Sequence, residues 1–141
     1  MNQLLLDLPL LRKSDLIRAR QRGRQIAALL AYAPNDQMRI AAAVFEIVVQ
    51  VGPRRGTTLR FQIAGHVLQV FTVPQSVLRF QVQLPAKAKL DRADLAWAVQ
   101  SLDQHTPLDV LHEMRQMNQE LLQMMHAEKR YLQPEPRPAA A

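Results

Sequence analysis

Four side chains of one predicted helix share a stripe that includes the chain's best candidates for chemistry. Arg39, Ala43, Glu46 and Gln50 follow one another at i, i+4, i+7 and i+11, which places them on one helix face. They could line a small pocket, in which a glutamine amide oxygen is able to ligate a cation. A glutamate alone makes no catalytic site. We therefore favour the alternative that Glu46 is a buried carboxylate, held by an arginine or by backbone donors at a sheet edge.

A second group of candidates is the set of basic residues on the preceding predicted helix. Six of the ten Arg and Lys residues in positions 1–60 fall within positions 12–24, and this half of the chain carries all of the excess positive charge. Such a cluster would attract an acidic protein surface, nucleic acid or a membrane face, with Arg18 and Arg22 as the expected contacts. The alternative is a solvated helix face. Nucleic acid fits less well, because aromatic residues make up only 5% of the chain and provide no stacking platform.

The third candidate is a stripe of apolar residues with a coiled-coil spacing near the C-terminus. Its members lie alternately three and four residues apart, and they are Leu111, Met114, Asn118, Leu121 and Met125. We call these five residues the seam. An asparagine in a seam can set the register of a parallel dimer, which favours homodimerisation, with Leu121 and Met125 also available to a partner. Alternatively, the stripe packs on its own domain.

The residues that could bind a metal ion or act as nucleophiles do not follow the spacing of a known motif. The four histidines (His66, His105, His112, His126) form no H-x-x-x-H or HExxH pattern, and there is no cysteine, so a metal site would need distant groups to converge. We expect no metal. The P-loop and G-x-S-x-G motifs are also absent from the sequence.

The elements that must position these candidates follow from the hydrophobic periodicity and the prolines. A short strand is expected at 3–8, and a helix from Ser14 or Asp15, as N-cap, to about Tyr32. A second helix, capped by Asn35 or Asp36, should run to about Val51. It is apolar nearly all round, which predicts a helix buried inside the domain.

Three segments with alternating polarity follow, at 57–63, 67–73 and 77–84, and they predict an antiparallel meander with one core face and one solvent face. Two further helices are expected, at about 91–104 and 108–132. The domain organisation is then 1–90 for the α/β domain, 91–106 for a connecting helix, 108–132 for a dimerisation or partner helix, and 133–141 for a disordered tail. No apolar run is long enough to cross a membrane, and no signal peptide is recognisable, so we expect a cytoplasmic protein.

Two segments resemble a known family. Residues 14–24 (SDLIRARQRGR) and 36–47 (DQMRIAAAVFEI) are similar to the anti-sigma-factor serine kinases of the GHKL (Bergerat-fold) ATPases, in particular the switch-protein kinases of bacterial stress signalling. The resemblance covers roughly 3–84. It implies an α/β fold, namely a two-layer sandwich of a mostly antiparallel sheet with helices on one face, truncated and followed by a long C-terminal helix. The helix around residues 117–122 also resembles the linker that leads into signalling coiled coils in sensor kinases.

The sequence departs from that family at the nucleotide site. The family's E-x-x-x-N motif, in which glutamate is the general base and asparagine holds the magnesium of ATP, reads Glu46 to Gln50 here, with glutamine in place of asparagine. The D-x-G-x-G adenine motif and the glycine-rich lid are missing from the sequence. The resemblance therefore implies a pseudokinase-like regulatory protein without a cofactor, acting by protein binding and homodimerisation in an anti-sigma, partner-switching or sensor-kinase pathway. The alternative is a minimal ATP- and magnesium-dependent serine or histidine kinase that uses Glu46 and Gln50.

Overall fold

Four strands form one sheet, in which each pair of neighbouring strands runs antiparallel. The structure, a computed structural model, describes residues 2–88, 92–102 and 108–132. The strands follow one another across the sheet in chain order, as β1 (Asn2–Pro9), β2 (Thr58–Ala64), β3 (Val67–Val73) and β4 (Val77–Gln83). The meander predicted from the alternating segments is confirmed, and β1 extends it by pairing with β2.

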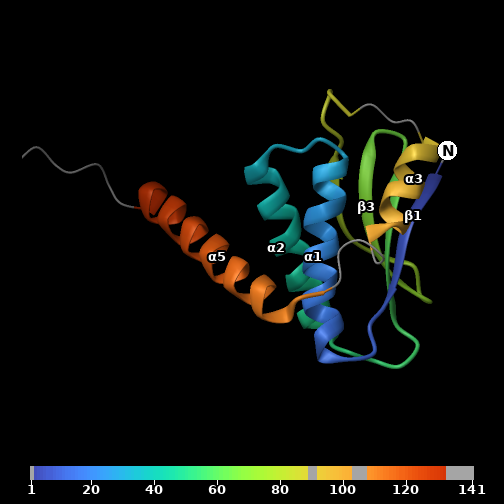
Figure 1. Cartoon of the computed structure of the whole chain (residues 1–141), viewed down its shortest axis with the longest axis horizontal. Helices are drawn as coiled ribbons and strands as arrows, with labels where there is room; N and C mark the ends of the chain where they lie inside the picture. Colours follow the sequence, from blue (N-terminus) through green and yellow to red (C-terminus); the bar gives the residue numbers. More distant parts are fainter. Residues whose placement is uncertain (1, 89–91, 103–107, 133–141) are drawn as a thin grey trace, which may run out of the picture. The chain divides into compact units, whose positions relative to one another are not determined.

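Two helices lie side by side on one face of this sheet (Figure 1). They are α1 (Lys13–Leu29) and α2 (Pro34–Val51), both inserted between β1 and β2. A third helix, α3 (Arg92–Gln100), packs against β1 and α1. The chain is thus of the predicted α/β class. It divides into two compact units, Met1–Val110 and Leu111–Ala141, and the helix α5 (Val110–Leu132) accounts for the described part of the second. The predicted tail at 133–141 lies outside the described residues.

The start of α1 differs from the expected cap. The helix begins at Lys13, so the N-cap is Arg12 rather than Ser14 or Asp15. Asp15 instead occupies the third helical position, where its Oδ2 accepts hydrogen bonds of 2.9 Å from the amides of Leu11 and Arg12. This is the reciprocal half of a capping box, in which a carboxylate reaches back to the turn before the helix. This carboxylate thus helps to hold the tight turn between β1 and α1.

The second helix is less buried than its composition suggested. Its N-cap is Ala33, with Pro34 at the first helical position, where a missing N–H costs nothing. Ile40, Ala41, Val44 and Val48 are buried, but Arg39, Glu46, Val49 and Gln50 are exposed. The prediction of a helix enclosed on all sides is therefore wrong. On its outer side Met38, Ala42 and Phe45 are only partly buried, and α2 forms an outer surface of the sandwich.

The core lies between the sheet and the two helices. Leu59, Phe61 and Ile63 of β2 and Leu68 and Val70 of β3 are buried, with 0–1% of each side chain exposed, and the intervening residues are only half-buried. Those intervening residues form the other face of the sheet. There Gln62 donates to Gln69 (3.0 Å), and Arg60 makes two hydrogen bonds to Asp7 (2.8 and 3.0 Å). The hydrogen bond to Asp7 and the negative charge of that carboxylate raise the pKa of Arg60. The predicted separation into a core face and a solvent face is confirmed.

A β-bulge changes which residues of β4 face the core. The register shifts between Val70 and Phe71, so Phe80 pairs with Val70 but Leu78 pairs with Phe71 on the outer face. Leu78 is consequently 42% exposed, whereas the simple alternation predicted it in the core. Arg79 is the extra residue opposite this step, and its Nε donates to Oγ1 of the buried Thr72 at 3.0 Å. An extra residue of this kind redirects the side chains around it.

Tyr32 ties the loop between α1 and α2 to the end of β4. Its ring is buried, and its hydroxyl donates a 2.9 Å hydrogen bond to the carbonyl oxygen of Gln83. Burial, and next the negative charge of Asp36, raise the pKa of Tyr32 to about 12 from its usual 10.0. The neutral phenol is thus the form that the folded state prefers.

We expect the ionisation of Tyr32 to lower the free energy of unfolding at high pH. Because its pKa is higher in the folded state, its contribution is complete below pH 10 and is lost as the pH rises from about 10 to about 12. The loss is at most about 2.7 kcal/mol, and screening by solvent lowers it. The measurement is the ultraviolet absorbance of phenolate in a Tyr131→Phe background. At pH 11 about nine-tenths of Tyr32 should be protonated in the folded protein, against about one-tenth in urea. Equal ionisation in both states would contradict the assignment.

Candidate functional site

The stripe identified on α2 faces outward. Arg39, Glu46 and Gln50 are exposed, and Ala43 is partly covered. The favoured interpretation of Glu46 as a buried carboxylate is therefore wrong, because α2 lies on the outside of the sandwich. The other interpretation was that the stripe lines a small pocket, and three of its four residues do so. Arg39 is not among the pocket residues.

The pocket lies between α2 and β4. Ala43, Glu46, Ile47 and Gln50 of α2 form one wall, and Arg79 and Phe80 of β4 form the other, around a volume of about 220 Å³. Sequence reasoning missed Arg79, because strict alternation placed it on the solvent face. Arg79 is exposed, but the β-bulge also brings it within hydrogen-bond distance of Thr72 and into the lining of the pocket. Arg79 could have been identified as a pocket residue only if the register between β3 and β4 had been known.

This pocket holds one carboxylate, one amide and one guanidinium at its polar positions. Glu46 and Gln50 are one helical turn apart, and Arg79 is fixed by its hydrogen bond to Thr72. Such a set can accept and donate hydrogen bonds to a small polar group. Its volume is below the roughly 300–1,000 Å³ that is usual for small-molecule sites, and Glu46 would repel a phosphate placed beside it. The geometry suits a polar contact better than an enclosed nucleotide.

The arginines expected to contact a partner lie deeper than a solvated face would place them. Arg18 is partly buried, and the side chain of Arg22 is only 2% exposed, with its Nη1 donating to Oε1 of Gln25 at 2.6 Å. Arg20 and Gln21 are buried as well. A buried guanidinium needs hydrogen-bond acceptors, which ties it to the interior of the folded chain. Of the two predicted contacts, Arg18 is the more accessible.

Four exposed cations lie together at one end of the sandwich. Arg12 and Lys13 precede and open α1, and Arg54 and Arg55 lie in the turn between α2 and β2; all four are exposed. Hydrogen bonds of 2.9 Å from the amide of Arg54 to the carbonyl of Leu10, and from the amide of Leu10 to the carbonyl of Thr57, hold the two turns together. The sequence alone did not indicate this cluster, because contacts between distant turns are not visible in one sequence.

The seam residues are all exposed on α5. The exposed fractions are 60% for Leu111, 44% for Met114, 44% for Leu121 and 55% for Met125, and Asn118 between them is exposed too. Leu122, beside the seam, is 57% exposed. An apolar stripe of this kind, running along successive turns of one helix, is uncommon on a surface that only meets water.

Histidines and other metal-binding side chains are dispersed. Within residues 2–88, 92–102 and 108–132, no group of three or more His, Cys, Asp or Glu is arranged to hold a metal ion. His66 lines a second hollow, of about 330 Å³, together with residues that follow β4. His105 lies outside the described residues. None of the described helices is long and apolar enough to span a membrane.

Comparison with protein-family models, with curated proteins and with solved structures gave no match.

Proposed function

We propose that the chain is a regulatory interaction module that forms a homodimer through α5 and binds a signalling protein. The observation that carries the proposal is the exposed seam of α5. The resemblance to anti-sigma kinases supplies the class of pathway, a bacterial partner-switching or sensor-kinase system. The small open pocket beside Glu46 supports a binding role over an ATP-dependent reaction.

The occupant we propose for the seam is a second copy of the same helix. Leu111, Asn118 and Met125 occupy one heptad position, and Met114 and Leu121 occupy the other. In a parallel pair each residue would meet its own counterpart, so the apolar positions would cover one another and Asn118 would face Asn118. α5 has 23 residues, which gives about 34 Å of helix and room for this repeat. Leu122 would widen the contact at its edge.

We expect the dimer to depend on the apolar seam positions. The double variant Leu121→Glu/Met125→Glu should sediment as a monomer at concentrations where the unchanged protein is a dimer, because each dimer would bury four carboxylates at apolar positions. Sedimentation equilibrium measures this. The matched control is Gln119→Glu/Gln123→Glu, which adds the same charge at exposed positions of the same helix outside the seam and should leave the dimer intact.

Asn118 offers a second readout of the same proposal. Replacing it with leucine should tighten the association or raise the oligomer order, since a buried asparagine trades stability for a defined pairing. An unchanged protein that remains monomeric in sedimentation refutes the dimer. A control variant that dissociates as completely as the seam variant also refutes it, because charge alone would then explain the loss.

A further inference from the structure

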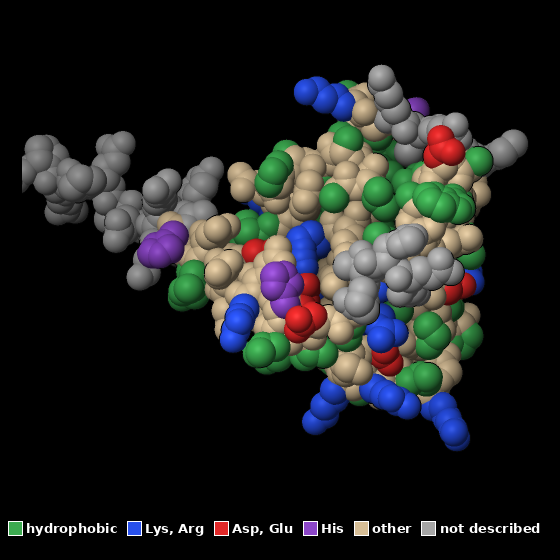
Figure 2. All heavy atoms as spheres, viewed as in Figure 1, with side chains coloured by type: hydrophobic (Ala, Val, Ile, Leu, Met, Phe, Trp, Pro, Cys, Tyr) green, Lys and Arg blue, Asp and Glu red, His purple; other side chains and the backbone are tan. Residues whose placement is uncertain are grey.

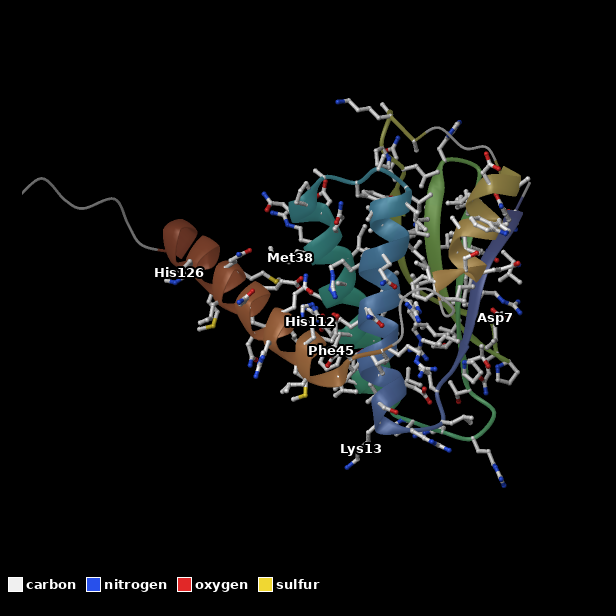
Figure 3. The ribbon with its side chains drawn as sticks, viewed as in Figure 1. Asp7, Lys13, Met38, Phe45, His112 and His126 are labelled. Carbon is white, nitrogen blue, oxygen red and sulfur yellow. The ribbon has the colours of Figure 1, made fainter. Side chains whose placement is uncertain are left out.

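Four cations and one leucine occupy the end of the sandwich where the turn before α1 meets the turn after α2. We call Leu11, Arg12, Lys13, Arg54 and Arg55 the basic tip. Figure 2 shows Lys and Arg side chains extending from this end, and Lys13 points away from the ribbons in Figure 3. Leu11 is 58% exposed. The tip is thus an exposed aliphatic side chain among four positive charges.

The structure holds this arrangement together. The two turns are joined by the backbone hydrogen bonds of Leu10 to Arg54 and Thr57, and the Oδ2 atom of Asp15 fixes the amides of Leu11 and Arg12. Asp15 therefore places one carboxylate beside the four cations. Four cations and one carboxylate leave a net charge of about +3 there, and in the described part of the chain none of the four cations has an ion pair. The positive charge is therefore available to a partner.

We propose that the basic tip is the docking surface for an acidic segment of a partner protein, in which carboxylates flank one apolar side chain. Charge complementarity to the four cations would steer and orient that segment. Leu11 would be covered by the apolar side chain at the centre, as in interfaces where an apolar anchor is ringed by polar contacts. The proposal rests on the tip alone and does not depend on dimerisation through α5.

Two other anionic partners fit the tip less well. A nucleic-acid backbone offers phosphates to the cations but nothing to cover Leu11, and the tip has no aromatic side chain for stacking bases. Leu11 could insert into a bilayer, but a single leucine buries little apolar surface there. Stable attachment to a membrane needs more inserted apolar surface in addition to the basic residues. An acidic segment with one apolar residue uses both features of the tip.

The test is fluorescence anisotropy at low salt with a labelled synthetic peptide of glutamates and serines around one leucine. The variant Arg54→Glu/Arg55→Glu should bind this peptide at least about tenfold more weakly than the unchanged protein, since attraction becomes repulsion. The matched control is Arg39→Glu/Lys87→Glu, which makes the same change of net charge at exposed positions outside the tip. Its affinity should stay within about twofold. Leu11→Ser should weaken the leucine peptide but not a peptide with serine in its place.

Equal losses in the tip variant and the control would overturn the proposal, because net charge alone would then explain the binding. Tighter, tip-dependent binding to phosphatidylserine vesicles or to duplex DNA than to the peptide would overturn it in favour of those partners. The peptide measurement is repeated on Leu121→Glu/Met125→Glu. If the peptide affinity of that monomer is unchanged, the basic tip binds independently of dimerisation. A failure of the dimer proposal can then be distinguished from a failure of the tip proposal.

Discussion

Replacing Gly23 with leucine should destabilise the domain by about 3 kcal/mol or more, a large share of the 5–15 kcal/mol that holds a typical domain folded. Gly23 lies in the middle of α1, where this helix packs closely against Val44 of α2. A Cβ atom added there would lie 3.1 Å from Cγ2 and 3.3 Å from Cβ of Val44. Alanine could be accommodated by a small shift, and its better helix propensity offsets the cost. Leucine adds three more carbons in the same direction, so the helices must separate.

Urea unfolding followed by circular dichroism measures this effect. The matched control is Ala28→Leu, on the same helix but at an exposed position, which should change stability by no more than about 0.5 kcal/mol. Shortening Val44 to alanine in the Gly23→Leu protein should recover part of the loss, because it removes the atoms that a new side chain would meet. Similar unfolding midpoints for the two leucine variants would show that the helices are not in close contact at Gly23.

The packing face of α1 could be predicted from the sequence, but the surroundings of the rest of the helix could not. The spacing indicated one buried stripe, and all of its members except the partly buried Leu16 are buried: Leu16, Ala19, Gly23, Ile26, Ala27 and Leu30. The same periodicity assigned Arg20 and Arg22 to a solvated face, although both are buried. A repeat of 3.6 residues identifies the most apolar face. It carries no information on how many neighbours a helix will have.

The strands show a similar limit. Alternation predicted the inward residues Leu59, Phe61 and Ile63 of β2, because this strand lies in the middle of the sheet and pairs with β3 without a register shift. It failed at Leu78, since a β-bulge, which depends on pairing with β3, shifts the alternation within β4. The pocket beside Glu46 was therefore only half predictable: its α2 wall follows from helical spacing, whereas its β4 wall depends on the bulge. The basic tip depends on contact between two turns about forty residues apart in the sequence, which no local pattern describes.

The second large effect concerns Phe61, on a strand in the middle of the sheet. This side chain is completely buried on the inner face of β2, and its neighbours across the sheet are Leu6 on β1 and Val70 on β3. Phe61→Ala should cost about 3–5 kcal/mol, because it removes a buried ring and leaves a cavity that strands on both sides keep from closing. The loss would leave a domain of ordinary stability close to unfolding at room temperature.

Phe71→Ala provides the matched control, since it removes the same ring from the neighbouring strand on the opposite face. Phe71 pairs with Arg60 and Leu78 there and is only partly buried. Water already reaches part of this ring and would fill the space it leaves. We therefore expect Phe71→Ala to lower the free energy of unfolding by less than half as much as Phe61→Ala. Urea unfolding at neutral pH compares the two proteins directly. Equal losses would contradict the assignment of the core to the helix side of the sheet, whereas a clear difference would support it in a measurement that does not involve α5 or the basic tip.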